Sequence, residues 1–239
     1  MAEIWIKANY RMLTPAIIKP YLPFDGIFSY YYAQTTGFKY KNAEGYIYDN
    51  LPVARYRYID ELPIQRTEYN GKWFYNISGM LFDEGVERGK TAIIRKYMEN
   101  TQLWLMRKPN IESLKWKYEE KSARGKEKAH LVAVETVYVP EFSILLEIKE
   151  ENEDFVVEIL ENVKAIGKKV NQGYGFVEFV DYECVNVKDF IYEGILIRPV
   201  PKRLVTDNGY AELPLRLFAP YYVKNEKYTD VCYIDRKFL

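Results

Sequence analysis

One short stretch, residues 166–176, combines glycines and lysines in the sequence IGKKVNQGYGF. Glycine lets the backbone turn through conformations that other residues avoid, and it removes side chains that would block a close ligand. Two adjacent lysines and the exposed amides of such a loop suit a polyanion, such as the phosphates of a nucleic acid. The alternative is structural: Gly167 would end a preceding helix, and Gly173 and Gly175 would form a tight entry into the next strand.

The sequence offers few residues for nucleophilic catalysis or for binding a metal ion. The chain contains one histidine, His130, and two cysteines, Cys184 and Cys232. Neither cysteine lies in a nucleophile motif, and the three residues lack the spacing of metal ligands. The carboxylates form no pattern of a two-metal nuclease or a glycosidase, and no Walker motif is present. The sequence therefore predicts no metal and no cofactor.

Apolar periodicity predicts the elements on either side of the loop. Residues 154–166 place apolar side chains along one face of a helix. Residues 176–182 alternate or run apolar, as a half-buried strand does. The loop is thus expected to join a helix to a strand.

The rest of the pattern predicts strands and one more helix. Residues 3–13 form a first strand, and a helix follows that begins near Asp25, which is placed to cap it. Asn70 and Gly71 are a strong hairpin signal between two apolar runs. Further strand-like stretches are residues 45–49, 55–59, 91–94, 131–139 and 142–148.

The bulk composition is that of a soluble globular protein: 239 residues, 48% of them hydrophobic and 28% charged. No apolar run approaches the ~20 residues that cross a membrane, and the N-terminus lacks the core of a signal peptide. Two cysteines without paired spacing suggest a reducing cytoplasm and no disulfide framework. We therefore expect a cytoplasmic protein.

The charge distribution points to a local rather than a global attraction for RNA. A net charge of zero argues against a freely diffusing, strongly basic RNA binder. Residues 107–128, however, hold eight Lys and Arg against four Glu, which gives this window a charge of +4. A solvated charged loop is the alternative reading of such a run. The 23 tyrosines supply stacking faces for bases or for protein partners.

The glycine-rich stretch resembles the loop of the RAMP superfamily, the repeat-associated RNA-binding proteins of CRISPR systems. In that family a ferredoxin-like, RRM-like domain carries the loop between its last helix and last strand. Residues 25–30, DGIFSY, are similar to the start of the first helix in Cas-five-type subunits, which cap the crRNA 5′ handle in type IV effector complexes. Residues 197–201 and 218–222 resemble that group's Arg-x-x-Pro and Pro-Tyr-Tyr/Trp segments.

The resemblance implies an α+β fold. We expect one ferredoxin-like domain over residues 1–239, with the glycine-rich loop, an inserted basic β-arm at about residues 107–140 and a C-terminal tail at residues 194–239.

The resemblance also implies a non-catalytic, crRNA-binding subunit of a CRISPR ribonucleoprotein that caps the 5′ handle. Its partners would be crRNA and the backbone and large subunits, without a membrane. Tyr174 or Phe176 would stack on an unpaired base. The residues expected to bind RNA are Gly167, Lys168, Lys169, Asn171, Gln172, Gly173, Tyr174 and Gly175 in the loop, Lys121, Arg124, Lys126 and Lys128 on the arm, and Arg198 in the tail.

Two alternatives stay open. The same superfamily includes metal-independent endoribonucleases that process CRISPR repeats, in which His130 would act as the general acid or base. Such families place their histidine on or near the first helix, and the first helix here offers tyrosines instead. The second alternative is a tyrosine-rich, protein-binding module without RNA. A non-enzyme is the leading expectation.

Overall fold

The computed structural model describes residues 2–37, 40–42, 47–48, 57–58, 61–82, 86–96, 130–215 and 230–238. The chain mixes α and β structure, with mostly antiparallel strands and few helices. It divides into two compact units. Residues Met1–Glu87 and Val137–Leu239 form the first unit, and Arg88–Thr136 form the second.

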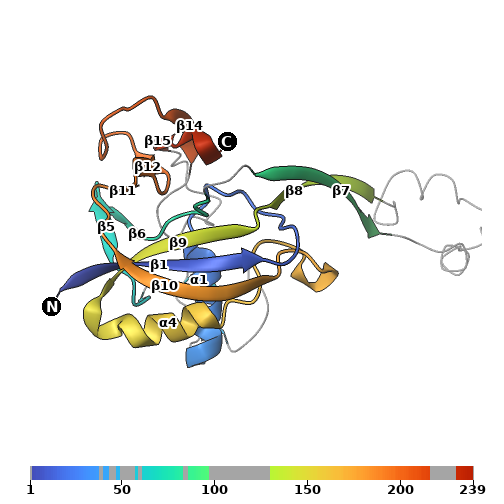
Figure 1. Cartoon of the computed structure of the whole chain (residues 1–239), viewed down its shortest axis with the longest axis horizontal. Helices are drawn as coiled ribbons and strands as arrows, with labels where there is room; N and C mark the ends of the chain where they lie inside the picture. The colour runs from blue at the N-terminus through green and yellow to red at the C-terminus, as the bar shows by residue number, and fades with distance from the viewer. Residues whose placement is uncertain are drawn as a thin grey trace, which may run out of the picture. The chain divides into compact units, whose positions relative to one another are not determined.

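A three-stranded antiparallel sheet forms the centre of the first unit (Figure 1). Strand β1 (Glu3–Met12) lies between β9 (Glu141–Lys149) and β10 (Val177–Val185). Buried and more exposed side chains alternate along β1, because successive residues of a strand point to opposite faces. The predicted strands at residues 3–13, 142–148 and 176–182 are confirmed.

An irregular segment, residues 76–81, extends this sheet beyond β9. The amide of Leu81 donates to the carbonyl oxygen of Ser143 at 2.9 Å, and the amide of Ser143 donates back at 2.7 Å. The amide of Ser78 donates to the carbonyl oxygen of Leu145 at 2.8 Å. Residues 76–81 therefore occupy a fourth, antiparallel position at the edge of the sheet.

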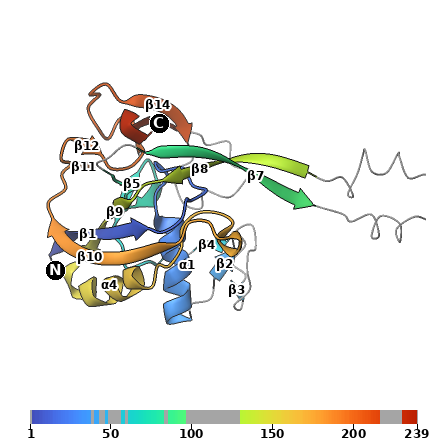
Figure 2. The same ribbon diagram turned by 45° about the vertical axis from the view of Figure 1, so that its right-hand side comes forward.

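Helices α1 (Asp25–Thr36) and α4 (Glu153–Glu161) contact each other and cover one face of the central sheet (Figures 1 and 2). The hydroxyl of Tyr10 on β1 donates to the carbonyl oxygen of Leu160 on α4 at 2.8 Å. Apolar side chains of both helices, Phe28 among them, belong to the main hydrophobic core of the protein. Burial of these faces is what holds the helices to the sheet.

Two helix predictions are corrected at their ends. Phe24, not Asp25, is the N-cap of α1, and Asp25 lies in the first turn of the helix. Helix α4 ends at Glu161 instead of residue 166. Ile166 is still buried, because the chain leaves the helix and packs the same apolar face as an extended segment.

The hairpin prediction is confirmed: β5 (Arg66–Tyr69) and β6 (Lys72–Tyr75) are joined by Asn70 and Gly71. Both turn residues have positive φ, 51° and 73°, as a type I′ turn requires. The other short elements of the first unit are β2 (Tyr40–Asn42), β3 (Ile47–Tyr48), β4 (Arg57–Tyr58), η1 (Glu150–Asn152), η2 (Val170–Gln172), β11 (Ile191–Tyr192), β12 (Ile195–Leu196), β13 (Val200–Pro201), β14 (Ala211–Leu215), β15 (Asp230–Ile234) and η3 (Arg236–Phe238).

Strands β7 (Glu87–Lys96) and β8 (His130–Tyr138) pair in a two-stranded sheet that makes up most of the described part of the second unit. Residues 97–129, which hold most of the expected basic arm, lie outside the described residues. No helix in the described part of the chain is long and apolar enough to cross a membrane.

Candidate nucleic-acid interface

The glycine-rich loop is fastened to the segment that follows β1. The amide of Gly175 donates to the carbonyl oxygen of Pro15 at 2.9 Å, and the amide of Lys168 donates to that of Ile17 at 3.1 Å. At the loop's end, the amide of Phe176 donates to the Thr14 hydroxyl at 2.9 Å. These contacts attach both ends of the loop to residues 14–17.

Two of the loop glycines are required by close backbone approach. A Cβ at Gly175, where φ is +72°, would lie 2.0 Å from the carbonyl oxygen of Ile166. A Cβ at Gly167, where φ is +80°, would lie 2.7 Å from the carbonyl oxygen of Ile17. Gly167 does not cap α4, which ends six residues earlier at Glu161. The glycines thus serve the packing of the loop onto its neighbouring segment.

The backbone amides expected to face a phosphate are already engaged. The amide of Gly173 donates to the carbonyl oxygen of Val170 at 2.9 Å, and the amide of Gly175 is bound to Pro15. A phosphate at the loop would therefore be bound by lysine side chains and not by these two amides. Lys168 is exposed and Lys169 is partly exposed, and neither forms an ion pair with a carboxylate in the described part of the chain.

Exposed apolar side chains lie at the end of the loop, where the chain enters β10. The amide of Leu13 donates to the carbonyl oxygen of Phe176 at 2.8 Å, which sets the two residues opposite each other. Their side chains are 54% and 39% exposed. Tyr174 is half-buried, so Phe176 is the loop's more open aromatic ring.

Sequence reasoning missed two members of this surface, Leu13 and Lys19. Lys19 is exposed, two residues beyond Ile17, whose backbone pairs with Lys168. Asn171, Gln172 and Gly173 are also exposed on the loop. Hydrogen bonds between the loop and residues 13–17 bring the two stretches together, and nothing local in the sequence signals them.

Arg198 is a core residue and not an RNA contact, which corrects the expectation for the tail. It is 2% exposed, and its guanidinium donates to the carbonyl oxygens of Tyr75 and Ile77. The same group lies 4.2 Å from the ring centre of Phe74. Burial lowers the pKa of Arg198 to about 10, against the opposing effect of the Asp25 carboxylate.

The other expected site residues fall elsewhere. Lys121, Arg124, Lys126 and Lys128 lie outside the described residues. His130 begins β8 in the second unit, whereas the glycine-rich loop belongs to the first.

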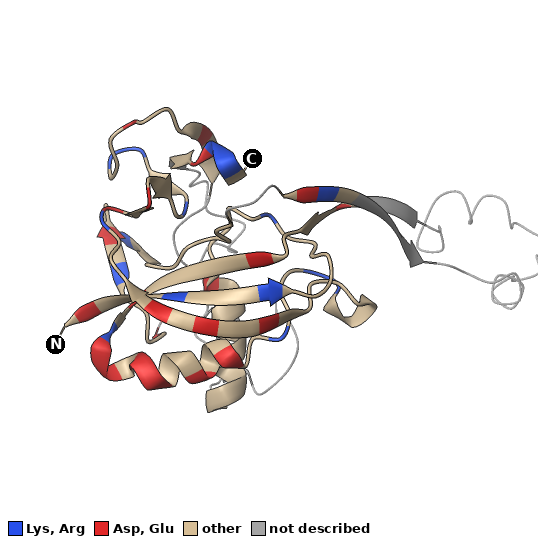
Figure 3. Cartoon of the chain, viewed as in Figure 1, with Lys and Arg blue, Asp and Glu red and all other residues tan. Residues whose placement is uncertain are grey.

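Acidic residues, red in Figure 3, occupy much of α4 and β10. The carboxylates of these two elements would repel a nucleic acid backbone.

Comparison with known proteins finds only distant likeness among solved structures. No family model matches the chain, and no curated protein is similar to it. Among solved structures, it is similar to a chain of "Cryo-EM structure of the Type III-B Cmr-beta bound to cognate target RNA", with a TM-score of 0.40 and 13% sequence identity. The likeness covers 77% of this chain and 61% of that chain, so this chain matches less than two thirds of its neighbour's length. So distant a likeness carries no argument about function.

Proposed function

We propose that this protein binds single-stranded RNA at the edge formed by the glycine-rich loop and residues 13–19. The observation that carries the proposal is the pair of lysines, Lys168 and Lys169, on a backbone-fastened loop that ends at the exposed residue Phe176. Lysine ammonium groups hold phosphates, and an open aromatic ring stacks on an unpaired base. The exposed amide side chains of Asn171 and Gln172 add hydrogen-bonding groups at the same edge.

The arrangement of the first unit supports a ferredoxin-like domain as the carrier of this loop. Along the chain, β1, α1, the edge segment 76–81, β9, α4 and β10 follow the βαββαβ order of that fold. Across the sheet, the antiparallel order is the edge segment, β9, β1 and β10. The loop precedes the last strand, as in the RAMP proteins that the sequence resembles.

The finer role is that of a non-catalytic crRNA-binding subunit of a CRISPR effector, one that caps the repeat-derived 5′ handle. This rests on the resemblance of residues 166–176 and 25–30 to RAMP and Cas-five-type segments. Its partners are crRNA and neighbouring backbone and large subunits. The basic residues of the arm, Lys121, Arg124, Lys126 and Lys128, are further candidates to clamp the RNA backbone.

Charge reversal at the loop tests the proposal. The double variant Lys168→Glu/Lys169→Glu should bind single-stranded RNA at least about tenfold more weakly than the unchanged protein. In the matched lysine-to-alanine variant, the slope of log K against log salt should fall by about 1.4, because two phosphate contacts are lost. Fluorescence anisotropy with a labelled RNA oligonucleotide measures both quantities.

The matched control is Lys188→Glu/Arg236→Glu, which makes the same change in net charge at two exposed cations outside the loop. It should bind RNA nearly as the unchanged protein does, since long-range charge effects between exposed groups are screened by salt. Equal losses in both double variants would show a general charge effect and contradict the loop as the binding site.

A further inference from the structure

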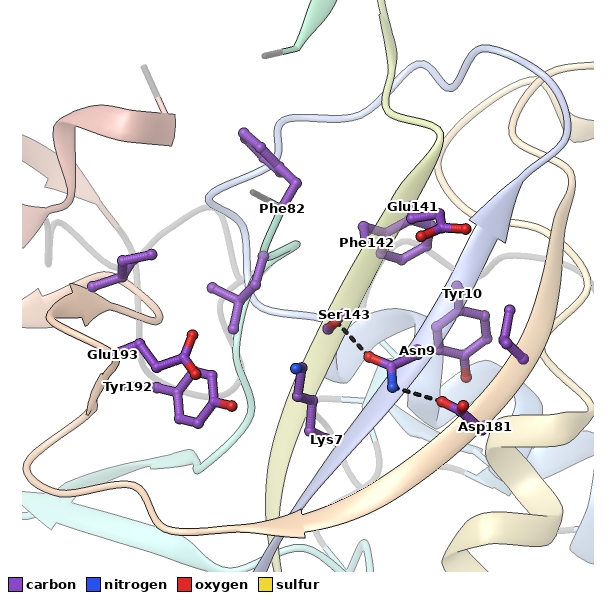
Figure 4. A pocket seen from close by; sticks show the side chains of 13 residues that line it. Lys7, Asn9, Tyr10, Phe82, Glu141, Phe142, Ser143, Asp181, Tyr192 and Glu193 are labelled. Atoms are coloured by element: carbon purple, nitrogen blue, oxygen red, sulfur yellow. Dashed lines mark hydrogen bonds between the residues drawn. The ribbon is translucent and has the colours of Figure 1, made fainter. Parts of the chain in front are cut away.

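A pocket of about 280 Å³ opens on the central sheet (Figure 4). Lys7 and Asn9 of β1 line it. Tyr10 bonds to Leu160 of α4, so its neighbour Asn9 and the next odd residue, Lys7, face away from the helices. Pockets for drug-sized ligands measure about 300–1,000 Å³, so this pocket lies just below that range and has room for one long side chain.

Hydrogen bonds fix the floor of the pocket. The hydroxyl of Ser143 donates to Asn9 Oδ1 at 2.7 Å, and Asn9 Nδ2 donates to Asp181 Oδ1 at 2.6 Å. The dashed lines in Figure 4 follow this chain of contacts across three strands. Asp181 keeps a second carboxylate oxygen, and an ionised carboxylate only accepts hydrogen bonds. The floor therefore presents a hydrogen-bond acceptor, the Asp181 carboxylate, whose position is fixed by these contacts.

Negative charge dominates the pocket. Asp181, Glu141 and Glu193 all line it, and none forms an ion pair with a cation in the described part of the chain. The lining ammonium, Lys7, is held by Glu183 at 3.0 Å. Phosphates would be repelled from such a surface, whereas a cation would be attracted.

The rings of Tyr192 and Phe82 line the walls of the pocket (Figure 4). Phe82 is only 5% exposed, so Tyr192 is the more open ring, and Lys7 Nζ lies 5.6 Å from its centre. Tyr192 belongs to the β11–β12 hairpin, whose turn residues Glu193 and Gly194 have φ values of 49° and 80°. This turn presents Glu193 across the pocket from Glu141 (Figure 4). Carboxylates on separate walls suit a flat cation with N–H groups pointing in several directions, better than one small ion that needs converging oxygens.

We propose that this pocket binds the arginine side chain of a partner protein. A guanidinium is planar and always charged, it carries five N–H donors in a fixed fork, and it stacks on aromatic rings. Its donors match the carboxylates of Asp181, Glu141 and Glu193, and its plane can lie against the part-exposed ring of Tyr192. Arginine is also enriched among the residues that anchor protein interfaces. This inference does not depend on RNA binding.

Nuclear magnetic resonance on the full-length protein tests the proposal, with Nα-acetyl-arginine methylamide as the probe. Titration should shift the side-chain amide signals of Asn9 and the backbone amides of Asp181 and Glu193, and the shifts should saturate. The neutral citrulline analogue, which has nearly the same shape, should cause no saturable shift. Asp181→Asn, a change at an exposed residue, should weaken arginine binding about tenfold.

Glu178→Gln is the matched control. Glu178 lies on the same strand as Asp181 but pairs with Arg11 at 3.4 Å, so this variant should bind the probe as the unchanged protein does. Glu193→Gln, which removes a carboxylate from the opposite wall of the pocket, should also weaken binding of the arginine probe. Equal shifts from the citrulline or lysine analogue, or no saturable shift up to the solubility limit of the arginine probe, would overturn the proposal. Cytidine shifting the same signals instead would assign the pocket to a nucleobase.

Discussion

The amide of Gly175 donates a hydrogen bond of 2.9 Å to the carbonyl oxygen of Pro15, across 160 residues of sequence. This contact joins the glycine-rich loop to the segment that leaves β1. Since Gly175 is buried and has positive φ, the loop approaches Pro15 and Ile166 more closely than any residue with a side chain would allow. The position of Lys168 and Lys169 depends on this close packing.

Replacing Gly175 with alanine should lower the free energy of unfolding by more than about 2 kcal/mol. The new Cβ would lie 2.0 Å from the carbonyl oxygen of Ile166, and alanine would also be strained at a φ of +72°. Gly173→Ala is the control: φ is +89°, but nothing lies within 4 Å of the new Cβ, so only the backbone strain of about 1 kcal/mol remains. Urea denaturation compares the two variants, and equal losses would contradict the packing argument.

Replacing Arg198 with methionine should lower the free energy of unfolding by about 3–5 kcal/mol. The buried carbonyls of Tyr75 and Ile77 would lose their donor, and the Asp25 carboxylate would lose its countercharge. Arg203→Met, at an exposed position, should change the free energy by no more than about 0.5 kcal/mol. Urea denaturation measures both; a loss at Arg198 as small as that at Arg203 would show that the buried guanidinium stabilises little.

Asp25 predicts a dependence of stability on pH. Burial raises the pKa of its carboxyl from 3.8 to about 6, although Arg198 acts in the opposite direction. The folded protein thus holds this proton more tightly than the unfolded chain does. The free energy of unfolding should therefore fall as the pH rises from about 4 to about 6, by about 3 kcal/mol from this group.

The matched variant for that prediction is Asp25→Asn, which cannot titrate at this position. Urea denaturation of both proteins between pH 4 and pH 7 gives the difference in their free energies of unfolding at each pH. As the pH rises, the free energy of unfolding of the asparagine variant should increase relative to that of the unchanged protein. Parallel pH profiles would mean that Asp25 is not protonated in the folded protein at pH 5.

His130→Ala should leave RNA intact to the same degree as the unchanged protein, because the proposed role is non-catalytic. A labelled CRISPR repeat RNA, incubated with each protein in the presence of EDTA and resolved on a gel, provides the measurement. Specific cleavage by the unchanged protein that disappears in His130→Ala would instead support the metal-independent endoribonuclease.

Local patterns in the sequence predicted much of the fold. Alternation located β1, β9 and β10, and Asn70 with Gly71 located the β5–β6 hairpin, because these signals act within a few residues. The end of α4 was wrong by five residues, since Val163 and Ile166 continue the apolar spacing while tertiary contacts take the backbone out of the helix. Helical periodicity alone does not show where a helix ends when the apolar spacing continues beyond it.

The sites were harder to predict, because contacts distant in sequence decide them. Arg198 stands in a basic, proline-flanked stretch that suggested a surface, yet backbone carbonyls from residues 75–77 receive its guanidinium in the core. Asn9, Ser143 and Asp181 form one polar chain only because the registers of β1, β9 and β10 align them. No pattern within a single segment of the sequence indicates that these three residues lie together.

The most direct test of the central claim is to isolate the native protein with its partners and to sequence the RNA that accompanies it, mapping both ends. We expect guide RNAs that share one repeat-derived 5′ tag ahead of variable spacers, and their loss from the Lys168→Glu/Lys169→Glu variant. A preparation of the unchanged protein that carries no RNA would contradict the proposed RNA binding and favour a protein-binding module.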